Sequence, residues 1–326
     1  MAREMMYGEA MATAIIEEMK RDENVIFYGQ NMAMTERDPM LKMFGRNRVR
    51  LAPISETAEI GIAVGAAVTG LRPIVELWMS EFMLVALDQV INEAPRLRYM
   101  SGGQVKVPLV LKAGYGFAAG WAGQHSNCIY HTLMGIPGLK VVVPSCSADA
   151  LGLMKAAIRD DNPVVYLHPY MLMIDSSEVP EGDYVVPIGV ADVKRAGSDI
   201  TIVATGWMVK KSLAAAETLA KEGINAEVVD PRSLAPLDVN TIIKSVAKTG
   251  RLVLVDQAPR HSSAAAIIAA EVAEHGFEHL RAPITMVTAL DTSIPYSEPL
   301  EEYVLPNEEK IIKAVKAVMA KQAVAA

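Results

Sequence analysis

Cysteine and long apolar runs are the first things that this chain lacks. Only two of its 326 residues are cysteines, Cys128 and Cys146. Two cysteines are too few, and wrongly spaced, for a disulfide framework or a zinc site. No stretch approaches the roughly 18 consecutive apolar residues of a membrane-spanning helix, and the first ten residues lack the apolar core of a signal peptide. These absences predict a reduced, cytoplasmic protein that has no membrane partner.

An excess of positive charge is also missing. The chain carries 31 basic and 38 acidic residues, a formal net charge of −7. The basic residues are dispersed and form no run that could follow a phosphate backbone, so no nucleic-acid partner is expected. With 51% hydrophobic and 21% charged residues, the composition is that of a globular protein. A chain of this length is expected to form roughly two domains.

Strand-like and helix-like segments alternate along the chain. Near-continuous apolar runs are typical of a parallel sheet that is buried on both faces. The expected strands of the first half are residues 25–28, 73–77, 108–111, 140–143 and 164–167, and the expected helices are residues 7–20, 57–69, 82–99 and 147–159. The sequence therefore predicts a doubly wound α/β domain with a mostly parallel sheet over residues 1–175. A polar linker over 176–199 and a smaller α/β domain over 200–326 complete the expected organisation.

Residues 54–71 are the most informative segment. Glu56 stands at the mouth of an apolar stretch that is rich in glycine and alanine. Small residues at such spacing let a helix lie close to a neighbouring backbone. A carboxylate at a dry junction of this kind is costly unless something pairs with it, and a cofactor nitrogen is one candidate. The alternative is that Glu56 and Glu59 only decorate the first helical turn, where the macrodipole favours anions.

A wider resemblance is carried by segments that follow one another from residue 54 to residue 296. They are residues 54–71, 72–104, 108–112, 123–126, 136–144, 156–166, 230–238, 257–260 and 291–296. In this order and spacing they resemble the β subunit of the thiamine-diphosphate-dependent 2-oxoacid dehydrogenases, which include the pyruvate, branched-chain and acetoin dehydrogenases. The resemblance covers nearly the whole chain. It implies a transketolase-like pyrimidine-binding domain followed by a transketolase-type C-terminal domain.

The resemblance implies roles for three side chains. Glu56 stands where the family places a carboxylate that hydrogen-bonds to a ring nitrogen of thiamine diphosphate. The imino group of the cofactor itself then removes the proton from C2. Phe82 matches an aromatic that stacks on the aminopyrimidine, with a core aromatic as the alternative reading. His125, within Gln-His-Ser, matches a histidine that moves protons on the substrate adduct, with a structural loop histidine as the alternative. His131 is the next candidate for that role.

The resemblance also implies two metal ions, potassium and magnesium. The family holds a potassium ion with oxygen atoms, and the matching positions are Leu109, Ala157, Ile158, Asp160 and Asn162. Hard oxygen donors suit such an ion, while an ordinary helix end before Pro163 is the alternative. Thiamine enzymes hold the diphosphate through Mg²⁺ with a Gly-Asp-Gly motif, yet the only Gly-Asp here is Gly182-Asp183 in the expected linker. A separate α subunit is therefore expected to hold the Mg²⁺ and the diphosphate.

The implied enzyme is a heterotetramer of two α and two β subunits. It would cleave a C–C bond next to the carbonyl of acetoin or a 2-oxoacid and pass the acyl group to a lipoyl-bearing acyltransferase. Some positions depart from the family: Gln30 and Asn31 replace two acids, Gly135 replaces a histidine, and Gln257 replaces a glutamate. The changes at Gln30, Asn31 and Gly135 leave open the alternative of a catalytically altered scaffold. A transketolase-like enzyme half is a separate alternative.

Overall fold

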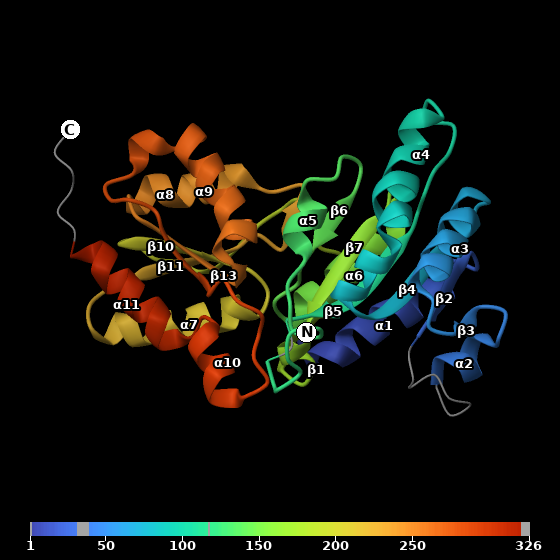
Figure 1. Cartoon of the computed structure of the whole chain (residues 1–326), viewed down its shortest axis with the longest axis horizontal. Helices are drawn as coiled ribbons and strands as arrows, with labels where there is room; N and C mark the ends of the chain where they lie inside the picture. The colour runs from blue at the N-terminus through green and yellow to red at the C-terminus, as the bar shows by residue number, and fades with distance from the viewer. Residues whose placement is uncertain (1, 31–38, 117, 321–326) are drawn as a thin grey trace. The chain divides into compact units, whose positions relative to one another are not determined.

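The computed structural model of the chain (Figure 1) describes residues 2–30, 39–116 and 118–320. Asn31, one of the departures named above, lies outside these ranges. The chain divides into two compact units. The first consists of Met1–Tyr115 and Thr132–Ile188, and the second of Gly116–His131 and Gly189–Ala326. Within the described ranges, no helix is both long enough and apolar enough to cross a membrane.

A parallel sheet forms the centre of the first unit. Its strands follow the order β6-β7-β5-β4-β2-β3, and each neighbouring pair is parallel. Their bounds are β2 Val25–Gly29, β3 Val49–Leu51, β4 Arg72–Met79, β5 Val110–Tyr115, β6 Lys140–Val142 and β7 Val164–Pro169. Every residue of β5 and β7 is buried, which agrees with the continuous apolar runs in the sequence. Beside this sheet, β1 (Ala2–Met6) and β8 (Ser176–Pro180) form an antiparallel pair.

Helices of the first unit pack through apolar stripes. In α1 (Tyr7–Arg21) the buried residues recur at intervals of three and four, as an amphipathic helix requires. This stripe packs against α6 (Ser147–Arg159), whereas α3 (Glu56–Val68) packs against β4. The remaining helical segments are α2 Pro39–Phe44, η1 Ser80–Ala86, η2 Gln89–Glu93, α4 Ala94–Met100, α5 Tyr130–Met134 and η3 Tyr170–Leu172. The doubly wound α/β fold that the sequence predicts is confirmed.

The single helix expected over residues 82–99 is wrong in form. The structure has a 3₁₀ segment (η1), a π-helical turn (η2) and a short α-helix (α4) instead. Pro95 gives the physical reason, because it occupies the first turn of α4. Proline has no N–H to donate and its ring clashes with the carbonyl four residues earlier. The backbone before it therefore widens into the π turn, and α4 begins afresh.

The second unit is a three-layer α/β arrangement. Its sheet follows the order β14-β13-β10-β11-β9, in which only β9 runs antiparallel to its neighbour. The strands are β9 Asp192–Arg195, β10 Ile200–Ala204, β11 Ala226–Asp230, β13 Leu252–Pro259 and β14 Thr285–Ala289, and β12 Ser233–Ala235 follows β11 in the chain. The helices are α7 Trp207–Lys221, α8 Val239–Thr249, η4 Arg260–Ser262, α9 Ala264–His275, η5 Phe277–His279, α10 Glu298–Val304 and α11 Glu308–Met319.

Alternate residues of β10 divide the core of the second unit. Ile200 and Ile202 pack on one face with residues of α7 and α11, while Val203 packs on the other face with residues of α8 and α9. Figure 1 shows these two pairs of helices on opposite sides of the sheet. Because both faces are covered, the strands carry apolar residues at nearly every position.

Candidate functional site

A buried acidic cluster lies at the start of α3. Glu56 is the first residue of this helix, and Glu59 follows one turn later. Glu56 is only 8% exposed and Glu59 only 2%. One amide serves both carboxylates. Nε2 of Gln30 donates to Oε1 of Glu56 at 2.9 Å and to Oε1 of Glu59 at 3.0 Å. Glu59 is therefore an acid of the first helical turn, as the alternative interpretation expected, and it is also buried and hydrogen-bonded.

The cluster stands where the strand order of the first sheet reverses. β2 has β3 on one side and β4 on the other. Gln30 directly follows β2, and η1 directly follows β4. In open α/β sheets, ligands bind beside the carboxyl ends of the strands at such a switch point. The fold thus brings Gln30 and the start of α3 to the edge where this class of protein binds its ligands.

Gly29 fixes the backbone that leads into the cluster. A Cβ at this position would lie 2.1 Å from the carbonyl oxygen of Glu76, and the residue has a φ of +153°. Only glycine tolerates this close approach at that φ. The N–H of Gln30 then donates to the same carbonyl of Glu76 at 3.2 Å. The end of β2 is therefore held against β4, which fixes the backbone position from which the Gln30 side chain starts.

Phe82 lies on η1, a segment that contacts α3. The hydroxyl of Thr57 donates to the carbonyl of Val85 at 3.0 Å, which ties α3 to the segment that carries Phe82. The Phe82 side chain is half-buried. Glu56 and Phe82 thus come from packed elements of one unit, as a shared role would need.

His125 belongs to the second unit, in the loop Gly116–His131. The ring of Trp121 meets its imidazole edge to face, with centroids 5.8 Å apart. The loop is closed and anchored inside its own unit. The N–H of Gly116 donates to the carbonyl of Asn127, and Nε2 of Gln257 donates to the carbonyl of Gly116 at 2.9 Å. Gln257, noted in the sequence only as a departure, is thus an anchor of the histidine loop.

His131 lies at the end of the same segment, in the first turn of α5. Burial lowers the pKa of its imidazole, and the charge of Asp256 opposes that shift only in part. Its Nδ1 is buried and accepts or donates no hydrogen bond within the part of the chain that the structure describes. An imidazole with a lowered pKa is neutral at neutral pH. His131 therefore carries no positive charge with which to form an ion pair with an acidic group.

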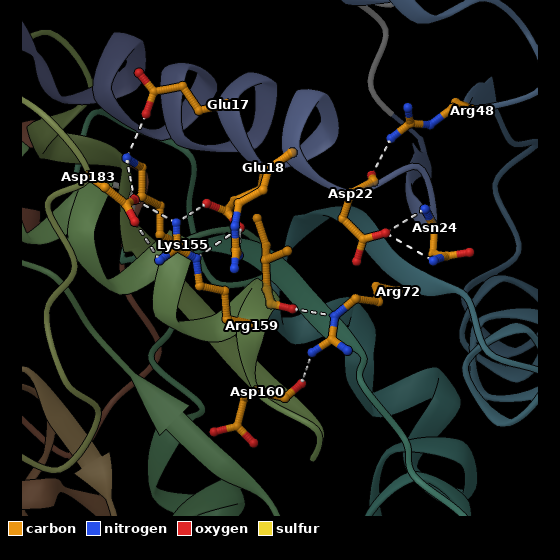
Figure 2. A network of polar contacts seen from close by, with 12 residues as sticks. Glu17, Glu18, Asp22, Asn24, Arg48, Arg72, Lys155, Arg159, Asp160 and Asp183 are labelled. Carbon is orange, nitrogen blue, oxygen red and sulfur yellow. Dashed lines mark hydrogen bonds and ion pairs between the residues drawn. The ribbon is translucent and has the colours of Figure 1, made fainter.

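The residues predicted to hold potassium lie at the amino edge of the first sheet, where α6 ends and β5 and β7 begin. The main-chain oxygens of four of these five residues already accept hydrogen bonds. The donors are the N–H of Val164 to Leu109, the N–H of Asp160 to Ala157, Nε of Arg72 to Ile158 and an Arg72 terminal nitrogen to Asp160. Figure 2 shows Arg72 reaching these last two carbonyls.

The side-chain oxygens of the same loop face cations. A nitrogen of Arg98 donates to Oδ1 of Asn162 at 2.8 Å, and Lys140 pairs with the carboxylate of Asp160. Burial raises the pKa of Asp160, but the hydrogen bonds from Lys140 and Asn162 outweigh it, so the pKa is lowered overall. A further cation would have to displace Arg98 or approach it closely. The set as it stands does not fit an added potassium ion, and that ion stays a prediction.

Asp183, from the only Gly-Asp of the chain, belongs to an ion-pair network (Figure 2). It pairs with Arg159 at 2.6 Å, and the nearly buried Lys155 reaches both Glu17 and Asp183. The hydrogen bond from Arg159 lowers the pKa of Asp183 to about 2. Asp183 thus has an internal role. Among the described residues, no group of three or more histidine, cysteine or acidic side chains could hold a metal ion.

Comparisons with known proteins agree with this architecture. The description "Transketolase, pyrimidine binding domain" matches residues 3–173, and "Transketolase, C-terminal domain" matches residues 189–311. A solved structure named "Split gene transketolase, inactive beta4 tetramer" has a TM-score of 0.80 and 24% identity, and it covers 96% of this chain and 98% of its own. At that identity the likeness shows the fold alone. The fold class is therefore a transketolase-like pair of α/β domains.

Relatives with similar sequences define more closely which transketolase-like proteins this chain resembles. The β subunit of acetoin:2,6-dichlorophenolindophenol oxidoreductase from Bacillus subtilis is 42% identical over 96% of both chains. The β subunit of the pyruvate dehydrogenase E1 component from Rhizobium meliloti is 43% identical over 96% of this chain and 70% of its own. The chain belongs to the transketolase-like family that contains these β subunits.

Proposed function

We propose that this chain is the β subunit of a thiamine-diphosphate-dependent dehydrogenase component. The observation that carries the proposal is Glu56, a buried carboxylate at the first turn of α3 within a pyrimidine-binding domain. Burying a carboxylate costs free energy unless a hydrogen-bond donor or a positive charge pairs with it. The named relatives act on acetoin or belong to a pyruvate dehydrogenase, so a carbonyl compound of that kind is the proposed substrate.

The residues present fit the pyrimidine half of the cofactor. Glu56 uses Oε1 for Gln30, and its Oε2 accepts no hydrogen bond from the part of the chain that the structure describes. That oxygen is available for a ring nitrogen, and a hydrogen bond to a charged group contributes about 1.5–3 kcal/mol. Thiamine diphosphate, when bound, supplies the carbanion chemistry that cleaves a bond next to a carbonyl.

Three side chains have proposed tasks around the cofactor. Glu56 holds the proton at the pyrimidine nitrogen, and Phe82 offers a ring face that orients the pyrimidine by stacking. His125 moves a proton at the oxygen of the substrate carbonyl as the acyl group is handed on. The half-buried position of Phe82 and the anchored loop of His125 support these tasks, because both side chains are held by their own units.

The diphosphate half needs a partner. We propose an α subunit that holds Mg²⁺ and the diphosphate, in an assembly of two α and two β chains, with a lipoyl acyltransferase as the acceptor. The names of the relatives as β subunits support an α partner. The engagement of Asp183 with Arg159 and Lys155 supports the same division, because the only Gly-Asp of this chain already serves an internal network.

The test is Glu56→Gln in the complex reconstituted with the α subunit. Glutamine fills the same volume but cannot hold the charge that stabilises the proton on the ring nitrogen. Hydrogen–deuterium exchange at C2 of the bound cofactor is expected to fall by roughly 10²–10⁴, the usual size of a lost acid–base group. Wild-type exchange in an assembled Glu56→Gln complex would overturn the assignment of Glu56.

A further inference from the structure

Within the ranges that the structure describes, the amide of Gln30 is the side chain that joins the two acids of the candidate site. It lies 2.9 Å from Oε1 of Glu56 and 3.0 Å from Oε1 of Glu59, and the residue is only 7% exposed. A primary amide has two N–H groups, so it can donate to both carboxylates at once. The two acids are held side by side because a neutral donor stands between them.

Glu59 is fixed from other directions as well. The N–H of Ser55 donates to its Oε1 at 3.0 Å, and the hydroxyl of Tyr28 donates to its backbone carbonyl. Burial, with the charge of Glu59, raises the pKa of Tyr28, so the phenol remains a neutral donor. The other oxygen of Glu59, Oε2, is buried without a partner in the described part of the chain. Glu59 is thus the fixed member of the pair.

Glu56 has fewer restraints. Its only hydrogen bond from a described side chain comes from Gln30. Without that amide, the charge of Glu59 would push the Glu56 carboxylate away, because like charges in a buried place repel strongly. The backbone of Gln30 is fixed, since its N–H donates to Glu76 and Gly29 lets β2 lie close against β4, and the side-chain amide is held by the two carboxylates themselves. The direction of the Glu56 carboxylate therefore depends on the Gln30 amide.

We propose that Gln30 is the positioning residue of Glu56, with Glu59 as the fixed anchor against which the amide is aligned. This inference rests on the proposed function, because it assigns the residue that aims the proposed catalytic carboxylate. It also explains why an amide suits this position. A glutamate here would bring a third carboxylate to the cluster and would, when ionised, leave Glu56 without its side-chain donor, while Glu59 would keep only the N–H of Ser55.

The experiment compares two substitutions in the complex with the α subunit. Gln30→Met keeps the length of the side chain and removes the donor. Gln30→Glu keeps the shape and removes the donor only while the new carboxyl is ionised. The matched control is Gln104→Met, the same change at an exposed position of the same unit. The readout is C2 hydrogen–deuterium exchange of bound thiamine diphosphate between pH 6 and pH 8, together with the KM for the cofactor.

Gln30→Met is expected to lower exchange by roughly 10- to 100-fold at every pH, the cost of misplacing a reacting group by about an ångström. Gln30→Glu should recover exchange as the pH falls, because a protonated carboxyl can again donate to Glu56. A purely structural role would give no such recovery. If Gln30→Met does not assemble, the pH dependence of Gln30→Glu alone decides.

The two proposals fail separately. If Glu56→Gln loses exchange while Gln30→Met keeps the wild-type rate, or Gln30→Glu has the wild-type pH profile, Gln30 is not a positioning residue and only this inference falls. If Glu56→Gln keeps wild-type exchange, the role of Glu56 falls, and the positioning role falls with it.

Discussion

His168 is a buried histidine on β7 whose Nδ1 lacks a partner in the described part of the chain. Burial, together with the charge of Lys112, holds the pKa of its imidazole well below the usual value. Its ring and that of Tyr170 pack edge to face, with centroids 5.3 Å apart. The folded protein therefore keeps His168 neutral, and this has a consequence for stability in mild acid.

We expect the free energy of unfolding to fall as the pH drops below about 6.5, where an unfolded histidine takes up a proton and the folded one does not. The contribution of His168 is at most about 1.4 kcal/mol per pH unit. His168→Phe keeps a ring beside Tyr170 and should flatten this slope in urea unfolding between pH 7.5 and pH 5.5. His275→Phe, at an exposed histidine, is the control. An unchanged slope in His168→Phe would contradict the prediction.

Single residues also mark the limit of what the sequence could tell about the site. The sequence predicts a role for Glu56 because the carboxylate and the glycine-rich segment beside it are neighbours in the chain. The amide that aims it, Gln30, is 26 residues away and reaches it only through the sheet. A glutamine after an apolar strand was noticed as a change from the family, but its function as a donor to two carboxylates depends on register and packing that no local pattern encodes.

At the scale of elements, periodicity predicted most of the fold. The expected helices over 7–20 and 147–159 correspond to α1 and α6, because their apolar stripes are regular and no proline interrupts them. The segment 82–99 failed because Pro95 outweighs the apolar pattern around it. The strand β5 begins two residues later than expected and extends to Tyr115, since strand ends depend on which neighbours are available for pairing.

The loop between α6 and β7 gives the element-scale prediction. Arg98 of α4 occupies Oδ1 of Asn162, an oxygen that a potassium ion would need. Arg98→Met frees this oxygen, so any stabilisation specific to potassium should be larger in the variant than in the wild type. Melting temperatures in potassium chloride and choline chloride at equal ionic strength measure it. Arg96→Met, an exposed residue of the same helix, is the control. A potassium effect that is absent from wild type and variant alike would rule out the ion at this loop.

At the scale of the whole molecule, the proposed function gives this chain one half of a cofactor site. It offers a carboxylate and an aromatic for a pyrimidine ring, while its only Gly-Asp is held by Arg159 and Lys155. We therefore expect the purified chain to bind thiamine diphosphate weakly and the complex with an α subunit to bind it tightly. Calorimetry with and without Mg²⁺ measures both. Micromolar, Mg²⁺-dependent binding by this chain alone would show that the division of the site is wrong.

The loop that carries His125 emerges from the ribosome long before its anchors do. Gln257, which binds the carbonyl of Gly116, is 141 residues further along the chain, and Glu301, which accepts from the N–H of Gly120, is 181 residues beyond that glycine. At roughly 5–20 residues per second, the first of these anchors is synthesised roughly 7–28 s after the loop. During that interval the nascent first unit can pair its sheet, but the segment between β5 and β6 must wait. The histidine is therefore among the last parts of the protein to reach its final position during translation.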